Sequence, residues 1–275
     1  MKHLLLAAKT DMSESLRSRW FMVYTLVFGG VIVALFMSGL TESRVMGFSG
    51  LSRVLVTYLQ ITMAILPVFV LITTVRSVAG DRDAGVFEYM LSLPVSLFAW
   101  FWGKMLGRFV VVFLPVFLAM FAAVAWGLGR GIEIPWQQVI YYTGFLLSLA
   151  WCFLGIGMLV STLARSSDVA TGIAFIIWLG LLLFMDLILL GLLIRQGMPS
   201  ETVIALALFN PMQVFRTAAM MLFDPQLVLL GQSAYVILDN FGKQGYILWA
   251  LLYPVGLGTA CAWFGYVIFK RSDLP

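Results

Sequence analysis

The sequence predicts an all-α polytopic membrane protein, and three observations support this fold class. Of its 275 residues, 62% are hydrophobic and 11% are charged, whereas soluble domains contain about 45–50% apolar and about 25% charged residues. The mean hydropathy is +1.01. The apolar residues form continuous runs of roughly 20, the length that a helix needs to cross a bilayer core about 30 Å thick. Barrel strands would instead alternate over about 10 residues.

Six stretches are long and apolar enough to be spanning helices. They are Trp20–Leu40, Val54–Val75, Met105–Trp126, Val139–Leu163, Ala170–Ile194 and Tyr246–Phe269. We therefore expect one transmembrane domain over residues 1–275, in which two connections, 76–104 and 195–245, are long.

The segment before the first span, residues 1–19, is expected to be a cytoplasmic interfacial helix. Leu5, Met12 and Leu16 fall near one helical face, and Lys9 and Asp11 lie elsewhere. Such a helix lies flat at a membrane surface. The alternative is a solvated tail.

The distribution of Lys and Arg predicts that both termini are cytoplasmic. With that orientation, 11 of the 17 Lys and Arg residues lie on the inner side, as the positive-inside rule requires. An even number of spans also places both ends of the chain on one side. Residues 76–104 then form a cytoplasmic loop and residues 195–245 a periplasmic one, which corresponds to a multi-pass protein of a bacterial inner membrane.

The inner loop has charges at its start and apolar residues after them. Asp81, Arg82 and Asp83 come first, and Phe87, Met90 and Leu91 then recur at helical spacing before Pro94, which would end a helix. This pattern predicts a short amphipathic helix that docks against a soluble partner. A plain connector resting on lipid headgroups is the alternative.

The stretch from Asp81 to Pro94, followed by Gly103-Lys104, resembles the signature of type-2 ATP-binding-cassette permeases. In that family this segment is the coupling helix, which seats in a groove of the ATPase subunit. The resemblance implies the following ATPase-coupling residues: Asp81, Arg82, Asp83, Gly85, Phe87, Glu88, Met90, Leu91 and Pro94. The sequence has Val86 where the family often has Thr or Ser.

The chain has no Gly-x-x-x-x-Gly-Lys-Ser/Thr loop to hold phosphates. We therefore expect no cofactor and no catalytic residue on this chain, with ATP and Mg on a partner ATPase. Six spans resemble half of a transport unit, which implies a homodimer with two ATPase copies. One His and two Cys leave few ligands for a metal site, and we expect none on this chain. The chain is also expected to contact membrane lipid and not to bind nucleic acid.

The outer loop, 195–245, is neither a clean span nor polar throughout. Its 204–209 apolar run and the polar breaks that follow favour short interfacial or re-entrant helices over a seventh span. Asn210-Pro211 and Phe215-Arg216 resemble the NosY-type membrane subunit of the transporter that matures nitrous oxide reductase, a copper enzyme. This resemblance implies a periplasmic solenoid partner that contacts the four residues Asn210, Pro211, Phe215 and Arg216.

Asp186 is an acid inside the fifth predicted span. A carboxylate at a helix centre costs about 2.5 to 3.5 kcal/mol to insert into a bilayer, so it must be protonated or paired. It either lies on the transport path or makes a polar contact at a dimer interface.

The outer side carries several Met residues: Met198, Met212, Met220 and Met221. Thioethers bind Cu(I), but no Met-x-x-Met repeat is present, and flexible packing at a partner surface is the simpler interpretation.

Three functions remain open. The first is an ABC-transporter permease for copper-enzyme maturation, which exports a copper- or sulfur-related species or drives a periplasmic partner; a general drug, lipid or polysaccharide exporter is the alternative cargo class. The second is a membrane anchor that recruits a soluble protein. The third, an intramembrane enzyme, is disfavoured because an aspartyl protease needs two facing carboxylates and Asp186 is the only acid in the predicted spans, and because the sole histidine, His3, is in the tail.

Overall fold

The computed structural model describes residues 2–38, 50–86, 96–184, 207–223 and 232–271, and every regular element within them is helical. The elements are α1 (Lys2–Leu16), α2 (Arg19–Met37), α3 (Gly50–Asp83), α5 (Leu97–Gly129), α6 (Trp136–Leu163), α7 (Ser167–Leu179), the π-helix η1 (Gly180–Phe184), α10 (Pro211–Phe223) and α11 (Gln232–Arg271). The predicted all-α fold is confirmed.

Within the described ranges, five helices are long and apolar enough to cross a membrane. They are Arg19–Met37, Leu51–Asp83, Leu97–Gly129, Trp136–Leu163 and Gly242–Arg271. These five cover five of the six predicted spans. Of the remaining one, Ala170–Ile194, the structure describes only the first part, as a shorter apolar helix over Ser167–Leu183.

The helices α3 and α5 are longer than the hydrophobic runs predicted. Helix α3 has 34 residues, or about 51 Å, and continues through the charged residues to Asp83. Helix α5 begins at Leu97, where Ser96 Oγ caps it by accepting a hydrogen bond from Ala99 N at 3.2 Å. Within the predicted cytoplasmic loop 76–104, residues 76–83 therefore continue α3, and residues 97–104 are the start of α5. Charged residues can continue a helix when its neighbours pair them.

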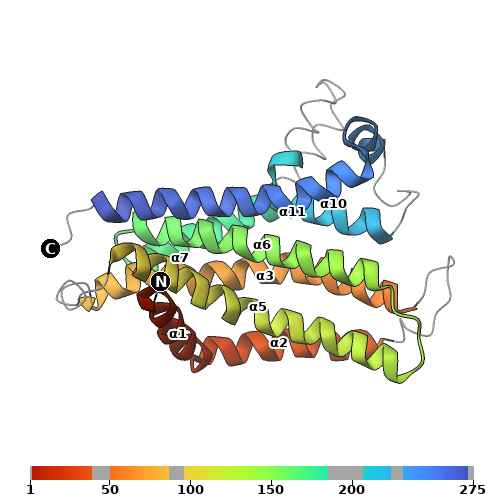
Figure 1. Ribbon diagram of the computed structural model, residues 1–275, viewed down its shortest axis with the longest axis horizontal. Coiled ribbons are helices and arrows are strands. Elements are labelled where there is room, and N and C mark those ends of the chain that lie inside the picture. The colour runs from red at the N-terminus through yellow and green to blue at the C-terminus, as the bar shows by residue number, and fades with distance from the viewer. Residues whose placement is uncertain (1, 39–49, 87–95, 185–206, 224–231, 272–275) are drawn as a thin grey trace.

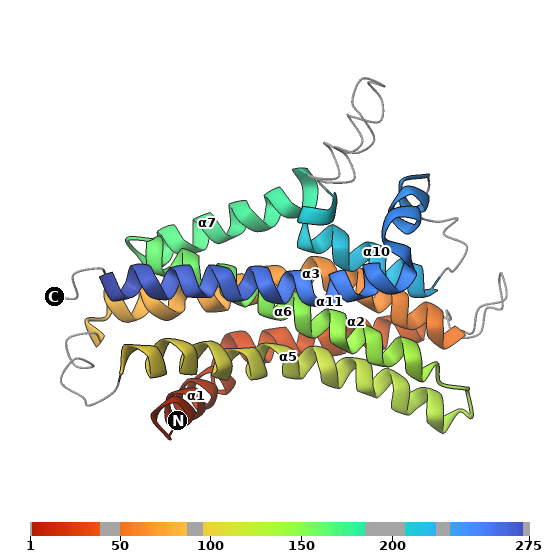
Figure 2. The ribbon, with the colours of Figure 1, turned by 45° about the horizontal axis from the view of Figure 1, so that its top comes forward.

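The helices are arranged as a bundle that runs along the long axis of the molecule (Figure 1). Helix α6 is central, because 72% of its most apolar 18 residues are buried, whereas the corresponding share in α2 is 22%. Helix α1, the end of α3, the start of α5, the α6–α7 turn and the end of α11 gather at one end, which we call the α1 end (Figures 1 and 2). Helix α10 and the α5–α6 turn lie at the other end, the α10 end.

Glycines allow α6 and α11 to cross at backbone contact. A Cβ at Gly155 would lie 1.9 Å from Gly258 O, so no side chain fits there. Ser148 Oγ, two turns along α6, donates to Leu251 O at 2.7 Å. This crossing fixes α11 against the central helix of the bundle.

Candidate functional site

The last turn of α3 carries three charged residues, which we call the Asp-Arg-Asp cluster: Asp81, Arg82 and Asp83. Successive residues of an α-helix are rotated by about 100°, so three consecutive side chains reach different neighbours. Asp81 forms an ion pair with Lys104 of α5. Lys104 also donates to Ser77 O at 3.1 Å, and its Nζ lies 4.6 Å from the centre of the Trp100 ring. The first residue of the cluster thus joins α3 to α5.

Arg82 and Asp83 join α3 to the turn between α6 and α7. The Arg82 guanidinium donates to Ala164 O at 2.9 Å and to Thr162 O at 3.4 Å, at the end of α6. Asp83 Oδ2 accepts from Ser167 N at 2.8 Å, at the start of α7. Helix ends leave carbonyl and N–H groups unpaired, and a cation at the C-terminus and an anion at the N-terminus are each stabilising. These two charges therefore cap two different helices.

A buried hydroxyl joins α6 to α3 just before the cluster. Ser161 Oγ accepts from Val78 N at 2.9 Å and from Ala79 N at 3.0 Å, and it donates to Val75 O at 2.6 Å. Gly157 permits this approach, since a Cβ there would lie 2.9 Å from the Thr74 Cβ of α3. The end of α3 is therefore held by backbone contacts as well as by charges.

The Gly103-Lys104 pair has two structural roles. Gly103 allows α1 to cross α5, because a Cβ at Gly103 would lie 2.6 Å from Ala7 Cβ. Gly107, one turn later, does the same against Ala8 O, at 2.5 Å. Lys104 points to α3 instead. The pair thus places α1 and the Asp-Arg-Asp cluster on neighbouring faces of α5.

Arg108 and Asp11 form a second ion pair, which the sequence interpretation missed. Arg108 Nε donates to Asp11 Oδ1 at 3.2 Å, and the Asp11 side chain is only 3% exposed. The guanidinium also donates to Thr73 O. Arg108 therefore joins α1, α5 and α3. The sequence did contain a sign of this pair: Arg108 lies inside the predicted span Met105–Trp126, and a charge within a membrane span requires a partner.

The N-terminal helix is confirmed as a helix, α1. Leu5, on its predicted apolar face, is 65% exposed, whereas Asp11 is 4% exposed because it is paired with Arg108. The interaction of α1 with α5 through alanines and one ion pair decides this orientation.

Helix α3 ends just before Gly85, whose φ of +67° lies in the left-handed region that glycine adopts readily. Gly85 N donates to Arg82 O at 3.1 Å and so closes the helix. The other predicted coupling residues lie outside the described residues: Phe87, Glu88, Met90, Leu91 and Pro94. The coupling helix therefore stays a prediction.

At the α10 end, Asn210 holds α10 against η1. Its Oδ1 caps α10 by accepting from Met212 N at 2.9 Å, and its Nδ2 donates to Leu181 O at 2.9 Å. Asn210, Pro211 and Phe215 are buried within this chain, which corrects the expectation that they form a surface for a periplasmic partner. Arg216 is half-buried. The amphipathic pattern of α10 is used to pack it onto α3, α6 and α11.

Two further predictions concern Asp186 and the methionines. Asp186 lies outside the described residues, as does Met198. Met212 and Met221 are each 2% exposed, and Met220 Sδ accepts from Gln60 Nε2 at 3.6 Å. In the described part of the chain no group of three or more His, Cys, Asp or Glu could hold a metal ion. Met212, Met220 and Met221 therefore contact other residues of this chain.

The described residues thus form a bundle of long apolar helices with a charged cluster at the end of α3. The family model for ABC-2 family transporter proteins matches residues 5–274, and the chain belongs to this family. It is therefore the permease subunit of an ABC transporter, and the family implies an ATPase partner and a permease that is typically dimeric.

Two curated proteins of the same kind are similar to this chain over most of its length. The chain is 23% identical over 272 residues to the "Probable ABC transporter permease protein NosY" of Stutzerimonas stutzeri, which covers 96% of each chain. It is also 23% identical over 223 residues to the protein of the same name from Pseudomonas aeruginosa, covering 79% of this chain and 81% of the relative.

Proposed function

We propose that the cytoplasmic ATPase docks at the α1 end and that the Asp-Arg-Asp cluster transmits its movement to the bundle. The observation that carries this proposal is the set of three contacts that the cluster makes, one each to α5, the end of α6 and the start of α7. The connection 84–96, which includes the predicted coupling residues Phe87 and Glu88, begins directly after the cluster.

The geometry supports transmission because the end of α3 has little independent freedom. A displacement of the 84–96 connection pulls on Asp83 and Arg82, which cap α7 and α6. It also pulls on Asp81, which is paired with Lys104 of α5. A membrane anchor needs only a docking surface, whereas a transporter needs these helices to move together. The arrangement therefore favours the transporter over the anchor.

The proposed assembly contains two copies of this chain and two ATPase copies, with both termini and the α1 end in the cytoplasm. Lys and Arg residues at the α1 end support this orientation, because Arg82, Lys270 and Arg271 all lie in the last turns of helices that end there.

Arg82→Ala is expected to lower stimulation of the partner ATPase by about fivefold or more, in the range of typical coupling free energies. The reason is that two carbonyls at the end of α6 lose their donor while α3 remains buried. The measurement is ATPase activity of the full chain in lipid vesicles, with the ATPase that co-purifies with it, against that ATPase alone.

The matched control is Arg130→Ala, which removes an arginine at the α10 end of the bundle, after α5. It should keep wild-type stimulation. Membrane insertion and bound ATPase are measured for each variant, so that loss of folding or of docking is recognised. Wild-type stimulation by an inserted Arg82→Ala protein would refute transmission through the cluster.

For the biological process we propose copper-enzyme maturation, by movement of a copper- or sulfur-related species or by work on a periplasmic partner. The support is the resemblance at Asn210-Pro211 and Phe215-Arg216 together with the two NosY-named relatives. Deleting the gene should leave the host's nitrous oxide reductase deficient in copper, as measured by metal analysis of the purified enzyme. A fully loaded enzyme would instead favour a general drug, lipid or polysaccharide exporter.

A further inference from the structure

Helix α7, together with the π-helix η1 that continues it, is fastened by hydrogen bonds near its two ends. At the α1 end, Ser167 N donates to Asp83 Oδ2 of α3 at 2.8 Å. In η1, Leu181 O accepts from Asn210 Nδ2 at 2.9 Å, just before α10. These two contacts are 14 residues apart (167 to 181), which corresponds to about 21 Å along the helix axis. Helix α7 therefore connects the Asp-Arg-Asp cluster to α10.

Between these contacts, α7 touches the bundle through one narrow face. Ala170 and Ala174, one turn apart, are 0% and 1% exposed, and α7 packs on α3. On its other faces, Val169 is 51% exposed and Ile176 is 71% exposed. In Figure 2 the axes of α7 and α11 diverge toward η1. Among the residues that the structure describes, none from 168 to 177 forms a hydrogen bond to another helix. The middle of α7 therefore has no polar contact that fixes its angle to the bundle.

The end of α7 and the middle of α3 each carry a feature that lets a helix bend, and the two features are joined. Residues Gly180–Phe184 form the π turn η1, and π turns, like prolines, are among the few causes of a sharp bend in a helix. Pro67 lies inside α3. Trp178 Nε1, just before the π turn, donates to Ala64 O, just before Pro67, at 2.9 Å. Both helices can therefore bend at this level, which we call the bend site.

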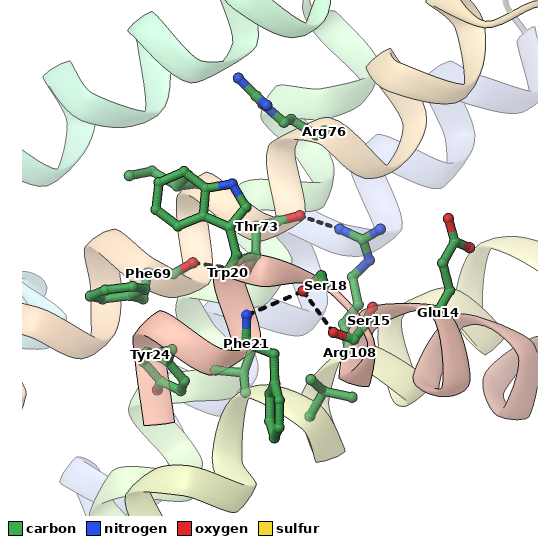
Figure 3. A pocket seen from close by; sticks show the side chains of 13 residues that line it. Glu14, Ser15, Ser18, Trp20, Phe21, Tyr24, Phe69, Thr73, Arg76 and Arg108 are labelled. Atoms are coloured by element: carbon green, nitrogen blue, oxygen red, sulfur yellow. Dashed lines mark hydrogen bonds between the residues drawn. The ribbon is translucent and has the colours of Figure 1, made fainter. Parts of the chain in front are cut away.

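The part of α3 between the bend site and the cluster is fastened to α5. Figure 3 shows Arg108 of α5 pointing at Thr73, and the guanidinium donates to Thr73 O. Nearer the end of α3, Lys104 of α5 is paired with Asp81. This part of α3 therefore moves together with the cluster, and Asp83 passes the movement to the start of α7.

Asn210 joins the π turn to a helix that is held from a second side. Asn210 is 1% exposed. Its Oδ1 caps α10 by accepting from Met212 N at 2.9 Å, while its Nδ2 donates to Leu181 O. Helix α10 is in turn bound to the central helix α6, because Tyr142 Oη donates to Ala219 O at 3.3 Å. Leu181 is therefore tied, through α10, to the centre of the bundle.

The side-chain amide of Asn210 does more than cap a helix. Asn, Asp, Ser and Thr are all favoured caps, because each supplies an acceptor. Among them only Asn carries an acceptor and a donor on separate atoms, so that it can cap α10 and bind a carbonyl of another helix at once. A serine at this position would keep the cap but lose the contact with Leu181.

We infer that the π turn is the pivot of α7 and that Asn210 is the positioning residue that fixes this pivot to α10. When the ATPase displaces the cluster, Asp83 carries Ser167 with it, and α7 tilts about Leu181 while the π turn stays in place. The inference rests on the proposed transmission through the Asp-Arg-Asp cluster, and it names the helix and the fixed point that this movement reaches.

The test measures movement at both ends of α7 by electron paramagnetic resonance. The full chain, with its native cysteines replaced by alanine, is bound to the ATPase that co-purifies with it. Spin labels at Val169→Cys and Phe264→Cys report on the start of α7, and labels at Leu183→Cys and Leu252→Cys report on the π turn; all four positions are exposed. An excess of unlabelled chain leaves one labelled copy per assembly. Each distance is measured without nucleotide and with ATP plus vanadate.

A tilt of roughly 10° about Leu181 moves Val169, about 18 Å away along the helix, by about 3 Å, but it moves Leu183 by less than about 1 Å. In the wild type we therefore expect the first distance to change by about 3 Å and the second by less than about 1 Å. In Asn210→Ser the π turn is no longer fixed, so the second distance should change by as much as the first.

Gln60→Met is the matched control, because methionine has a similar shape but lacks the donor. It removes a different bond to α10, the one from Gln60 Nε2 to Met220 Sδ, and should keep the wild-type pattern. Asn210→Thr, which has another favoured cap, replaces Asn210→Ser if that variant fails to fold or to bind the ATPase.

Equal changes of both distances in the wild type would mean that α7 slides, and unchanged distances would mean that it stays still; either result overturns the pivot. A wild-type pattern in the folded Asn210 variant would overturn the role of Asn210. ATPase stimulation by Arg82→Ala, measured in parallel, tests the proposed transmission separately. Lowered stimulation in that variant without a tilt of α7 in the wild type would refute the pivot alone.

Discussion

Gly155→Ala is expected to destabilise the protein by about 3 kcal/mol, the upper part of the usual range for overpacking. The added Cβ would lie 1.9 Å from Gly258 O and 2.5 Å from Gly258 C, both backbone atoms of α11. A backbone cannot rotate away as a side chain does, so the two helices must separate. Denaturant unfolding of the purified chain in detergent measures the change.

Gly172→Ala is the matched control for this prediction. Gly172 is also in a helix, α7, but nothing lies within 4 Å of the position that its Cβ would take. Alanine favours a helix over glycine by about 1 kcal/mol, so this variant should equal or exceed the wild type in stability. If both variants unfolded at the same denaturant concentration, the close crossing of α6 and α11 would be wrong.

Asp11→Ala is expected to lower the free energy of unfolding by about 3 kcal/mol, the lower end of the cost of breaking a buried ion pair. The substitution leaves Arg108 without its carboxylate, and the Arg108 side chain is only 16% exposed. Because the same guanidinium donates to Thr73 O, part of its interaction survives. The same unfolding measurement applies.

Two comparisons separate the ion pair from a general effect on α1. Lys9→Ala changes an exposed charge of the same helix and should shift stability by less than about 0.5 kcal/mol. Adding Arg108→Met to Asp11→Ala should restore part of the loss, because no unpaired charge remains. A double variant as unstable as the sum of the two single variants would contradict the pairing of Asp11 with Arg108.

The positions of the spans followed from sequence because membrane insertion depends on local hydrophobicity. Trp136–Leu163 begins three residues before the predicted span and ends at the same residue. The ends of α3 and α5 could not be predicted from hydropathy. The hydropathy falls at Arg76, for example, whereas α3 continues to Asp83. What extends α3 is its contact with Ser161 and Lys104, and those residues are more than 20 positions away in the chain.

The candidate site was found in part. The order of charges in Asp81, Arg82 and Asp83 and the resemblance of the segment to permeases identified the cluster, but not its partners. That Asp83 caps α7 and Arg82 caps α6 depends on where those helices end in space. For Asn210 the sequence likeness suggested a surface, whereas the packing of α10 buries the residue.

The amino-acid sequence alone determined that the chain is helical, that it lies in a membrane and that it resembles a permease, because composition, run length and a linear motif are properties of neighbouring residues. Tertiary structure decided which charges are paired and which glycines are contact points. Asp11 and Arg108 are 97 positions apart, and no local pattern brings them together. Only the crossing of α1 over α5 does.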